Sequence, residues 1–512
     1  MMNDLRIRIE KRAQSIAILL MLICISAQVL AQIPKRMGPG AAEDIKKAFV
    51  VVEANLDSLK AHRKYMYEMG YSNPALLTQY DLWMKKYPKN VNIPLAIGTI
   101  YHNAEMPQAK DFLLKAAAMD PENAKVWAML SADASRWGQD DLAAEYITKA
   151  TLADPSNAVY AYGLLATFEN GDRNTFEKKV FDFAQQFPEN DLGGQALYWL
   201  GEHSTNLHDK IRCLEALREL YPPEKFAKTT FRLRGLADAY LQTNPEKALL
   251  LINEVGNDTD WTSRKEVAES LIRADKLEQE QNYKGAIIEL DRMKLPGFNY
   301  IDDFITLKKA SLQERAGGAR EAYDGLSVKF AKRPSDPLHD ALELYGNKIG
   351  KDKVHIVEDI ERIRNSTATA AYPFELGLYT SNGTLRLDEL KGKVILLTFW
   401  FPGCGPCKAE FPHFQSVVDS FKGDSLVYLG INVFPSQDGY VIPFIKNNKY
   451  SFIPLRGDPT FASQNYGVYS QPTNFLIDKD GKIIFKNFRI DNRNRRTLKL
   501  MISSLLEKGP EK

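Results

Sequence analysis

The sequence predicts an all-α repeat solenoid followed by an α/β domain, and three observations lead to this prediction. Residues 42–350 are rich in Ala, Leu, Lys and Glu, with apolar residues at helical spacing. In that region, prolines that follow an aromatic or acidic residue recur at intervals of 33 or 34 residues. Beyond residue 371 the pattern changes to strands and helices in alternation. A length of 512 residues accommodates both parts, since one domain takes roughly 150 residues.

Composition and charge exclude several classes of protein. Lys and Arg total 67 against 65 Asp and Glu, which leaves a formal net charge of +2. Proteins dedicated to nucleic acid or anionic membranes need an excess of basic residues, so neither partner is expected. Four cysteines are too few for a disulfide-built scaffold. The seven histidines are scattered without metal-ligand spacing, so we expect no metal and no cofactor.

The first 31 residues are predicted to be a signal peptide. Four basic residues precede an apolar run from Ile16 to Ile25, and Val29-Leu30-Ala31 supplies the slim residues that a signal peptidase needs. We therefore expect cleavage after Ala31 and an exported protein, periplasmic or otherwise extracytoplasmic. An uncleaved anchor is the alternative, although the run is shorter than the about 20 apolar residues that span a bilayer. No membrane span is expected after cleavage.

A repeat of about 34 residues organises the predicted helices of residues 42–350. Aligning Pro121 on Pro155 also brings Ala109 onto Ala143. Small residues such as these alanines let two helices approach closely, and proline suits the opening of the next helix, where its missing N–H is not needed. Each helical hairpin would bury its apolar face against its neighbours. The prolines that mark the period are Pro88, Pro121, Pro155, Pro188 and Pro222.

These features resemble tetratricopeptide repeats. The resemblance rests on the period, on the Asp-Pro starts at Asp120 and Asp154, and on Trp199-Leu200-Gly201 in a first-helix position. It implies a concave face that binds a peptide or protein partner. A structural spacer is the alternative.

Residues 351–371 are predicted to be a linker, because charged residues give way there to a run of small polar ones. The next domain, residues 372–508, opens with Asn382-Gly383, a strong hairpin signal. The apolar run at 394–400 predicts a strand covered on both faces. After it we expect a helix at 404–421, a strand at 427–433, a helix at 440–448, a hairpin at 473–485 and a helix at 495–506.

Cys404-Gly405-Pro406-Cys407 follows the apolar strand directly and opens a helix. A thiolate in the first turn of a helix faces unpaired N–H groups and the positive end of the helix dipole, which lower its pKa from about 8.5 toward roughly 7 or below. Cys404 is therefore the predicted nucleophile. Cys407, one turn further and facing inward, is placed to attack a mixed disulfide at Cys404.

Other uses of this motif fit the sequence less well. A zinc site needs a second ligand pair, and the other mature cysteine, Cys213, lies in the helical region, where it is expected to be a buried packing residue. Haem attachment needs a histidine where Lys408 stands. An inert structural disulfide remains open, although so short a loop would add little stability.

The segment from 373 to 506 resembles the thioredoxin fold and, more narrowly, the exported TlpA/ResA-like thiol–disulfide oxidoreductases. The resemblance is carried by residues 387–394, 399–400, 404–407, 408–412 and 471–478. It implies a cis peptide at Pro472, packed against the cysteines, beside which a substrate peptide pairs. The substrate-binding residues that it implies are Trp400, Gly403, Gln471, Pro472 and Thr473.

The same resemblance implies a third catalytic residue, Glu410, because a glutamate at this place in the family influences thiol ionisation and proton transfer. Glu410 stands one helical turn after Cys407. A solvated surface carboxylate is the alternative. Thr398 stands where cytoplasmic thioredoxins carry a buried aspartate, which favours the exported subfamily. Gly403 and Gln471 depart from the residues common in the family at these substrate-facing positions.

The function predicted is that of an exported thiol–disulfide oxidoreductase acting on protein disulfides or thiols. The Gly-Pro pair between the cysteines favours a disulfide reductase, supplied by an upstream thiol–disulfide donor, with the repeats recruiting partners. The alternative is a non-catalytic interaction scaffold with a regulatory or docking thioredoxin-like domain. A peroxidase is weaker, because Pro-x-x-x-Thr-x-x-Cys is missing before Cys404.

Overall fold

The computed structural model of the chain describes residues 40–507, apart from 170, 205, 257, 298, 424 and 492. The signal peptide predicted at 1–31 lies outside the described residues. The chain divides into two compact units. One contains the residues up to 153 together with 436–440, and the other contains 154–435 and the residues from 441 onward.

The first unit is helical, and consecutive helices pack as hairpins, α5 with α6 and α7 with α8. The predicted role of proline is wrong in detail. Pro121 lies in a turn, and α7 begins three residues later behind Asn123, whose side chain accepts from the N–H of Val126 at 3.3 Å. An asparagine cap binds the free N–H groups of the first turn, which proline cannot do. The helices are α2 (Ala42–Ala54), α3 (Leu59–Met69), α4 (Pro74–Lys86), α5 (Asn92–Asn103), α6 (Ala109–Met119), α7 (Ala124–Arg136) and α8 (Asp140–Ala153).

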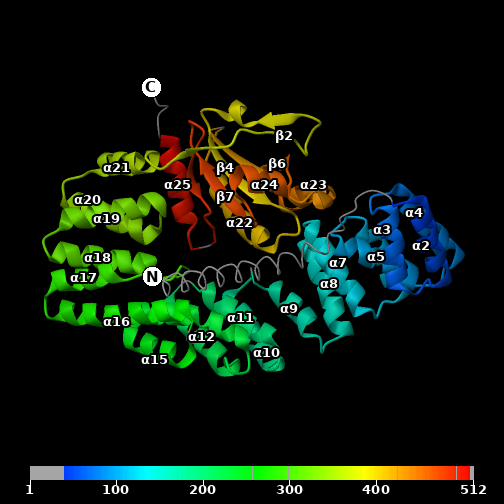
Figure 1. Ribbon diagram of the computed structural model, residues 1–512, viewed down its shortest axis with the longest axis horizontal. Helices are drawn as coiled ribbons and strands as arrows, with labels where there is room; N and C mark the ends of the chain where they lie inside the picture. The colour runs from blue at the N-terminus through cyan, green and yellow to red at the C-terminus, as the bar shows by residue number, and fades with distance from the viewer. Residues whose placement is uncertain are drawn as a thin grey trace, which may run out of the picture. The chain divides into compact units, whose positions relative to one another are not determined.

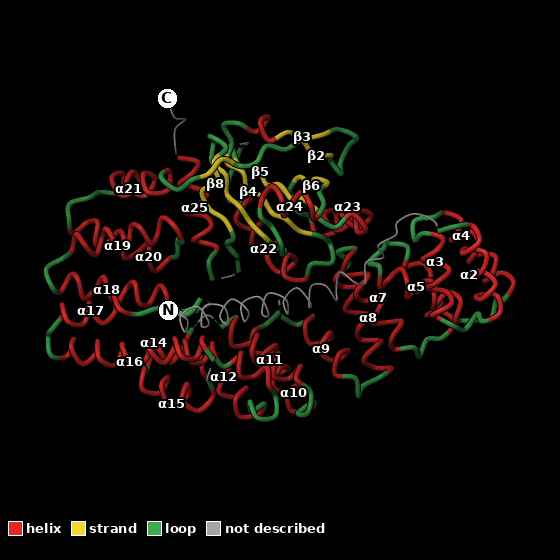
Figure 2. Tube along the Cα trace, viewed as in Figure 1, coloured by secondary structure: helices red, strands yellow, loops and turns green. Residues whose placement is uncertain are grey.

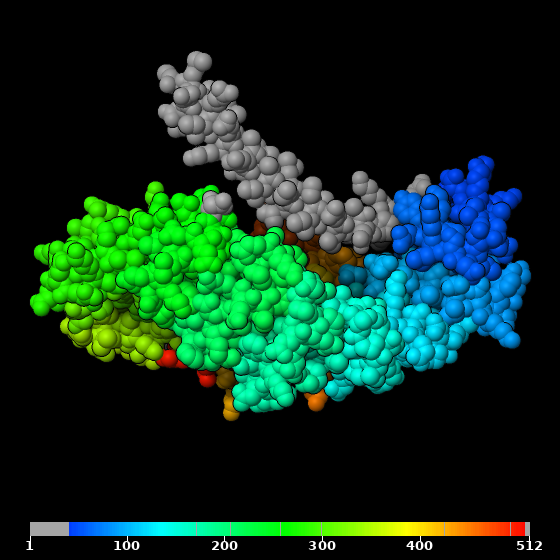
Figure 3. Space-filling view, turned by 90° about the horizontal axis from the view of Figure 1, so that it is seen from below, coloured from blue at the N-terminus to red at the C-terminus, as the bar shows by residue number. Residues whose placement is uncertain are grey.

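The second unit begins with further stacked helices. In the space-filling view their colour changes gradually from one helix to the next, because neighbours in sequence are neighbours in space (Figure 3). Their bounds are α9 (Ala158–Ala166), α10 (Arg173–Gln186), α11 (Asp191–Glu202), α12 (Leu207–Leu220), α13 (Ala227–Arg232), α14 (Arg234–Thr243), α15 (Pro245–Val255), α16 (Thr259–Gln279), α17 (Tyr283–Arg292), α18 (Asp302–Arg315), α19 (Ala319–Lys332), α20 (Asp336–Lys348) and α21 (Lys353–Asn365).

Helix α21 corrects the prediction of a linker at 351–371. Its first turn is capped by Asp352, whose side chain accepts from the N–H of His355 at 3.0 Å. Ile356, Ile360 and Arg364 are buried on one face. These positions are four residues apart, the spacing of an amphipathic helix, so the charged composition of this segment belongs to its exposed face.

The C-terminal part of the second unit is an α/β domain built on a sheet of order β1-β8-β7-β4-β5-β6 (Figures 1 and 2). Strand β4 is central, parallel to β5 and antiparallel to β7. The sheet strands are β1 (Thr369–Ala370), β4 (Val394–Trp400), β5 (Leu426–Asn432), β6 (Ile453–Arg456), β7 (Thr473–Ile477) and β8 (Lys482–Lys486), and a separate hairpin pairs β2 (Glu375–Gly377) with β3 (Thr384–Arg386). The helices are η1 (Leu387–Leu390), α22 (Gly405–Val418), η2 (Pro435–Gln437), α23 (Asp438–Asn448), α24 (Pro459–Tyr466) and α25 (Arg495–Glu507).

Both faces of β4 are buried, as its unbroken apolar run predicts. Val394, Leu396 and Trp400 pack with α22 and α25 on one face. Ile395, Leu397 and Phe399 pack with α24 on the other. Thr398 shares the first face with Trp400, because alternate residues of a strand point to the same side. The fold class predicted from the sequence, a helical array followed by an α/β domain, is confirmed.

Helix α25 also contacts the last helices of the array within this unit. Arg496 donates to Asp340 of α20 at 2.7 Å. Arg364 of α21 donates to Ser504 at 2.9 Å and lies 4.5 Å from the centre of the Phe485 ring. This part of the array surface is therefore occupied by the chain's own α/β domain. No helix in the described part of the chain is both long and apolar enough to cross a membrane.

Candidate redox site

The two cysteines lie at the junction between the end of β4 and the start of α22. Cys404 is the N-cap of α22, and its Sγ accepts a hydrogen bond from the N–H of Cys407 at 3.2 Å. The two form a disulfide with their Cα atoms 5.3 Å apart. A sulfur in this position accepts from the free N–H groups of the first helical turn, which stabilise it as a thiolate when the disulfide is reduced. The predicted placement of the pair at a strand–helix junction is confirmed.

The disulfide is largely shielded. Cys404 is 4% exposed and Cys407 is fully buried. Gly405 and Pro406, which lie between them, are exposed. A reaction partner would therefore meet the site from the side of this Gly-Pro turn.

The segment before β7 lies at the same edge of the sheet. The Gln471–Pro472 peptide bond is cis, as the resemblance implies. Thr473 pairs in register with Phe399, so Pro472 falls beside the end of β4 that leads to Cys404. Pro472 is buried, whereas Gln471 and Thr473 are half-buried. Gly403, directly before Cys404, is also half-buried.

Trp400 corrects the predicted set of substrate-binding residues. Its side chain is fully buried. The indole packs against Phe411, Phe444 and Phe452, with ring centroids 5.2 to 5.4 Å away. As the last residue of a strand covered on both faces, it points into the core under α22 rather than toward solvent. Trp400 therefore packs in the core under α22 and cannot touch a substrate at the surface.

Glu410 is a buried residue and not a solvated surface carboxylate. It is 6% exposed, on the face of α22 that also buries Cys407. Its Oε2 accepts from Nδ2 of Asn474 at 2.8 Å. Its Oε1 lies 3.6 Å from Nη1 of Arg489, a side chain that is itself half exposed. Burial raises the pKa of Glu410 to about 7, and the hydrogen bond from Asn474 and the charge of Arg489 oppose that rise. This carboxyl therefore exchanges a proton in the neutral range.

Asn474 and Arg489 were not predicted as site residues. Asn474 is fully buried and is the register partner of Thr398 across β4 and β7. A polar residue on each of two otherwise apolar neighbouring strands is the signal that could have found this pair, since buried polar side chains need partners. Nothing local marks Arg489, which reaches Glu410 from the segment between β8 and α25.

Cys213 is buried in the helical array, as predicted. Burial raises the pKa of its thiol to about 11. Within the described residues, no three His, Cys, Asp or Glu side chains gather in a way that could hold a metal ion.

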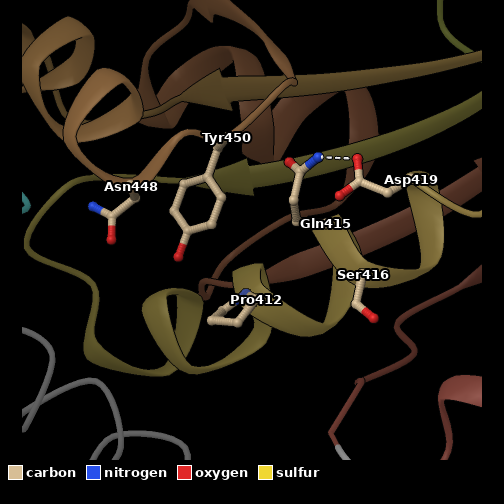
Figure 4. A pocket seen from close by; sticks show the side chains of 6 residues that line it. All are labelled: Pro412, Gln415, Ser416, Asp419, Asn448 and Tyr450. Carbon is tan, nitrogen blue, oxygen red and sulfur yellow. Dashed lines mark hydrogen bonds between the residues drawn. The ribbon is translucent and has the colours of Figure 1, made fainter.

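A pocket of about 590 Å³ lies between α22 and the end of α23 (Figure 4). Gln415 spans part of it and donates to Asp419 at 2.6 Å and to Ser451 at 3.0 Å. Its lining contains neither Cys404 nor Cys407. The lining residues are Pro412, Gln415, Ser416, Asp419, Asn448 and Tyr450.

The site thus combines a buried disulfide at a strand–helix junction with a cis proline before the neighbouring strand β7, and comparisons with known proteins relate this domain to thiol–disulfide oxidoreductases. Residues 368–486 match the AhpC/TSA family. Thiol-disulfide oxidoreductase ResA of Bacillus subtilis (strain 168) is 32% identical over 105 residues, which cover 20% of this chain and 58% of that protein. Sporulation thiol-disulfide oxidoreductase A of the same organism is 34% identical over 95 residues, covering 18% and 58%. The chain thus spans less than two thirds of the length of these relatives.

Solved structures with a similar part include a putative thiol:disulfide interchange protein DsbE from Chlorobium tepidum, which is 26% identical with a TM-score of 0.25 and covers 27% of this chain and 96% of that chain. StoA from Bacillus subtilis is 28% identical with a TM-score of 0.22, covering 25% and 94%. The chain therefore combines a mostly helical N-terminal region with a C-terminal α/β thioredoxin-fold domain whose relatives are thiol–disulfide oxidoreductases.

Proposed function

We propose that this protein is an exported thiol–disulfide oxidoreductase that reduces or exchanges disulfides in partner proteins through Cys404 and Cys407. The observation that carries the proposal is the Cys404–Cys407 disulfide, with Cys404 as the N-cap of α22 and its sulfur accepting from a backbone N–H. Similarity of the C-terminal domain to proteins named thiol-disulfide oxidoreductases supports the same chemistry. Export rests on the signal-like pattern of residues 1–31.

The first step is attack by the Cys404 thiolate on one sulfur of a substrate disulfide. A mixed disulfide forms between Cys404 and the substrate, the substrate S–S bond breaks, and the second substrate sulfur leaves as a thiolate that takes up a proton. Main-chain N–H groups at the start of α22 stabilise the attacking thiolate. Gly403, Gln471, Pro472 and Thr473 are the residues we propose to hold the substrate peptide at this stage, because Gly403 precedes Cys404 and the other three begin β7 beside the end of β4 that leads to Cys404.

The second step releases the reduced substrate. The Cys407 thiol loses its proton, attacks Sγ of Cys404 and forms the Cys404–Cys407 disulfide, while the remaining substrate sulfur leaves and is protonated. Two electrons have then passed from the dithiol to the substrate. Glu410 is placed one turn from Cys407, and a carboxyl with a pKa of about 7 can accept that proton near neutral pH. An upstream dithiol donor must reduce the disulfide again by the reverse exchange.

We propose that the helical array recruits partner proteins to this domain. Support comes from the repeat period in the sequence and from helices that pack on their neighbours in the chain, such as α7 with α8 and α11 with α12. Helices α20 and α21 contact the α/β domain through Arg496 and Arg364, so the faces that make these contacts are not part of the proposed recruiting surface.

A non-catalytic scaffold is the second candidate. The shielding of the disulfide, with Cys404 only 4% exposed, favours this alternative over an open active site. A scaffold would keep the disulfide closed and would form no covalent intermediate.

Trapping the mixed disulfide separates the two functions. With Cys407→Ser, a catalytic site accumulates partners linked through Cys404, because the second step is blocked while the first proceeds. The linked species are read on non-reducing gels after export. Cys404→Ser is the matched control and should trap far less, and Cys213→Ser should leave trapping unchanged. If Cys407→Ser traps no more than Cys404→Ser, the enzymatic proposal fails and the scaffold remains.

A further inference from the structure

Asn474 has an amide whose orientation is set by three partners. Its Nδ2 lies 2.9 Å from the main-chain oxygen of Phe488. A carbonyl oxygen only accepts, so the atom facing it must be the donor end of the amide. The same nitrogen donates its second proton to Oε2 of Glu410 at 2.8 Å. At the other end, Oδ1 accepts from the hydroxyl of Thr398 at 2.9 Å.

These hydrogen bonds connect strands β4 and β7 with helix α22 in the interior of the domain. Thr398 on β4 is 1% exposed, Asn474 on β7 is fully buried, and Glu410 on α22 is 6% exposed. The hydroxyl of Tyr428 on β5 lies 3.5 Å from the hydroxyl of Thr398 and is the last group in this series of hydrogen-bonded side chains. Every hydrogen-bonding group of the Asn474 amide is in use, so its rotation would break three bonds in a region that water does not reach.

We propose that Asn474, held by Thr398 and by the Phe488 carbonyl, is a positioning residue of the redox site: it fixes the Glu410 carboxyl so that Oε1 is the atom that gains and loses the proton. The biological use of this positioning rests on the proposed thiol–disulfide exchange. The hydrogen bonds that hold Asn474 do not depend on that function. Oε2 accepts from the amide at 2.8 Å, whereas Oε1 has only the longer contact with Arg489 at 3.6 Å, so a proton costs less on Oε1.

The charged and titratable groups around Glu410 are few. Arg489 approaches Oε1 from the segment before α25, and the N–H of Ile490 also favours the ionised carboxylate. Cys407 precedes Glu410 on α22, and Tyr428 faces it from β5. Of these contacts, the hydrogen bond from Asn474 opposes the effect of burial on the pKa of Glu410 most strongly. Its loss should therefore raise the pKa of Glu410 and shift the protonation of this carboxyl to higher pH.

The test measures the protonation of Glu410 directly in the full-length oxidised protein. The infrared C=O band of its protonated carboxyl is identified as the band that Glu410→Gln removes, and it is followed from pH 5 to 9. In Asn474→Leu the midpoint should move to higher pH by about one unit, so that the ratio of ionised to protonated carboxyl at a given pH falls about tenfold. Thr398→Val should move it in the same direction by less, because the amide then loses one of its two anchors and keeps the Phe488 carbonyl, and Thr398→Ser should restore the original midpoint.

The matched control is Asn432→Leu. Asn432 is also a fully buried asparagine of the sheet, and its Nδ2 donates to the Tyr379 hydroxyl at 2.8 Å. This variant loses comparable hydrogen bonds without touching Glu410, so the midpoint should stay in place. Equal midpoints in Asn474→Leu and Asn432→Leu would overturn the proposal. The infrared measurement needs no substrate, so it decides on Asn474 even if Cys407→Ser traps nothing, and trapping can succeed even if the midpoint does not move.

Discussion

Several side chains of the helical array meet partners about one repeat away, whereas Asn474 in the redox site meets partners from distant segments. Arg212 contacts Glu177, 35 residues earlier, and Lys225 contacts Glu189, 36 residues earlier. At the redox site, Asn474 contacts Glu410 across 64 residues and Thr398 across 76. The array therefore distributes its stability over repeated local contacts, while the site depends on a few contacts that only the complete α/β fold brings together.

The two regions should also affect the reactivity of a cysteine thiol in opposite ways. The difference in reactivity is the largest effect that we predict. In the reduced protein, Cys404 should react with iodoacetamide at pH 7 at least about a thousandfold faster than Cys213, since the helix N-terminus favours the Cys404 thiolate and burial raises the pKa of Cys213 to about 11. Mass spectrometry of the labelled peptides over time measures both rates.

Urea provides the control for this comparison, because both cysteines should react at similar rates in the unfolded chain. A Cys404 as slow as Cys213 in the folded, reduced protein would contradict both the site and the proposed function.

Within the array, the ion pair of Arg264 and Asp238 is buried, as the redox site is, and so differs from the ion pairs on the array surface. Arg264 of α16 and Asp238 of α14 are both fully buried and form two hydrogen bonds of 2.8 and 3.0 Å. Arg264→Leu should lower the free energy of unfolding by about 3–5 kcal/mol, because it leaves a buried carboxylate without its counter-charge. Urea denaturation followed by circular dichroism measures the loss.

The double variant Arg264→Met with Asp238→Leu sharpens this prediction. Removing both charges leaves no ion to desolvate, so most of the lost stability should return. A double variant that is less stable than Arg264→Leu would show that the pair contributes through attraction and not merely through the cost of separating it.

How far sequence predicts structure also differs between the two regions. The repeat period and the order strand, Cys-x-x-Cys, helix were readable because each lies within one short segment. Helix α24 and strand β6 were missed, since one has eight residues and the other contains Pro454, which is unfavourable in most strands. The partnership of Asn474 with Glu410 depends on register and helix placement, and no local pattern encodes either. Trp400 is predicted to bind substrate because family resemblance locates a residue in the chain without saying which way its side chain points, and the structure buries it.

The buried carboxyl of Glu410 should make the stability of the α/β domain depend on pH. Its pKa rises from 4.5 to about 7 in the folded protein, so the folded state holds the proton more tightly than the unfolded chain. Stability is then highest below pH 4.5, as far as this group is concerned, and falls by about 3 kcal/mol as the pH rises through 7. Native-state hydrogen exchange of the β4 amides, corrected for intrinsic rates, measures this domain within the full chain.

Two variants test the assignment of that pH dependence. Glu410→Gln cannot ionise and should remove the decline between pH 5 and 8. Glu389→Gln changes an exposed glutamate of η1 in the same domain and should leave it intact. A decline that survives in Glu410→Gln would assign the pH dependence to other groups.

The smallest effect is expected for the ion pairs on the surface of the array. Lys225 and Glu189 join neighbouring repeats at 2.6 Å, but their side chains are 51% and 74% exposed. Water and salt screen such a pair, so Lys225→Ala should cost less than about 1 kcal/mol, and the cost should vanish in 1 M NaCl. A loss as large as that from Arg264→Leu would mean that the repeats are held together by their surface charges. A small loss places the stability of the array in its buried apolar faces, and leaves this surface free to change without disturbing the redox domain.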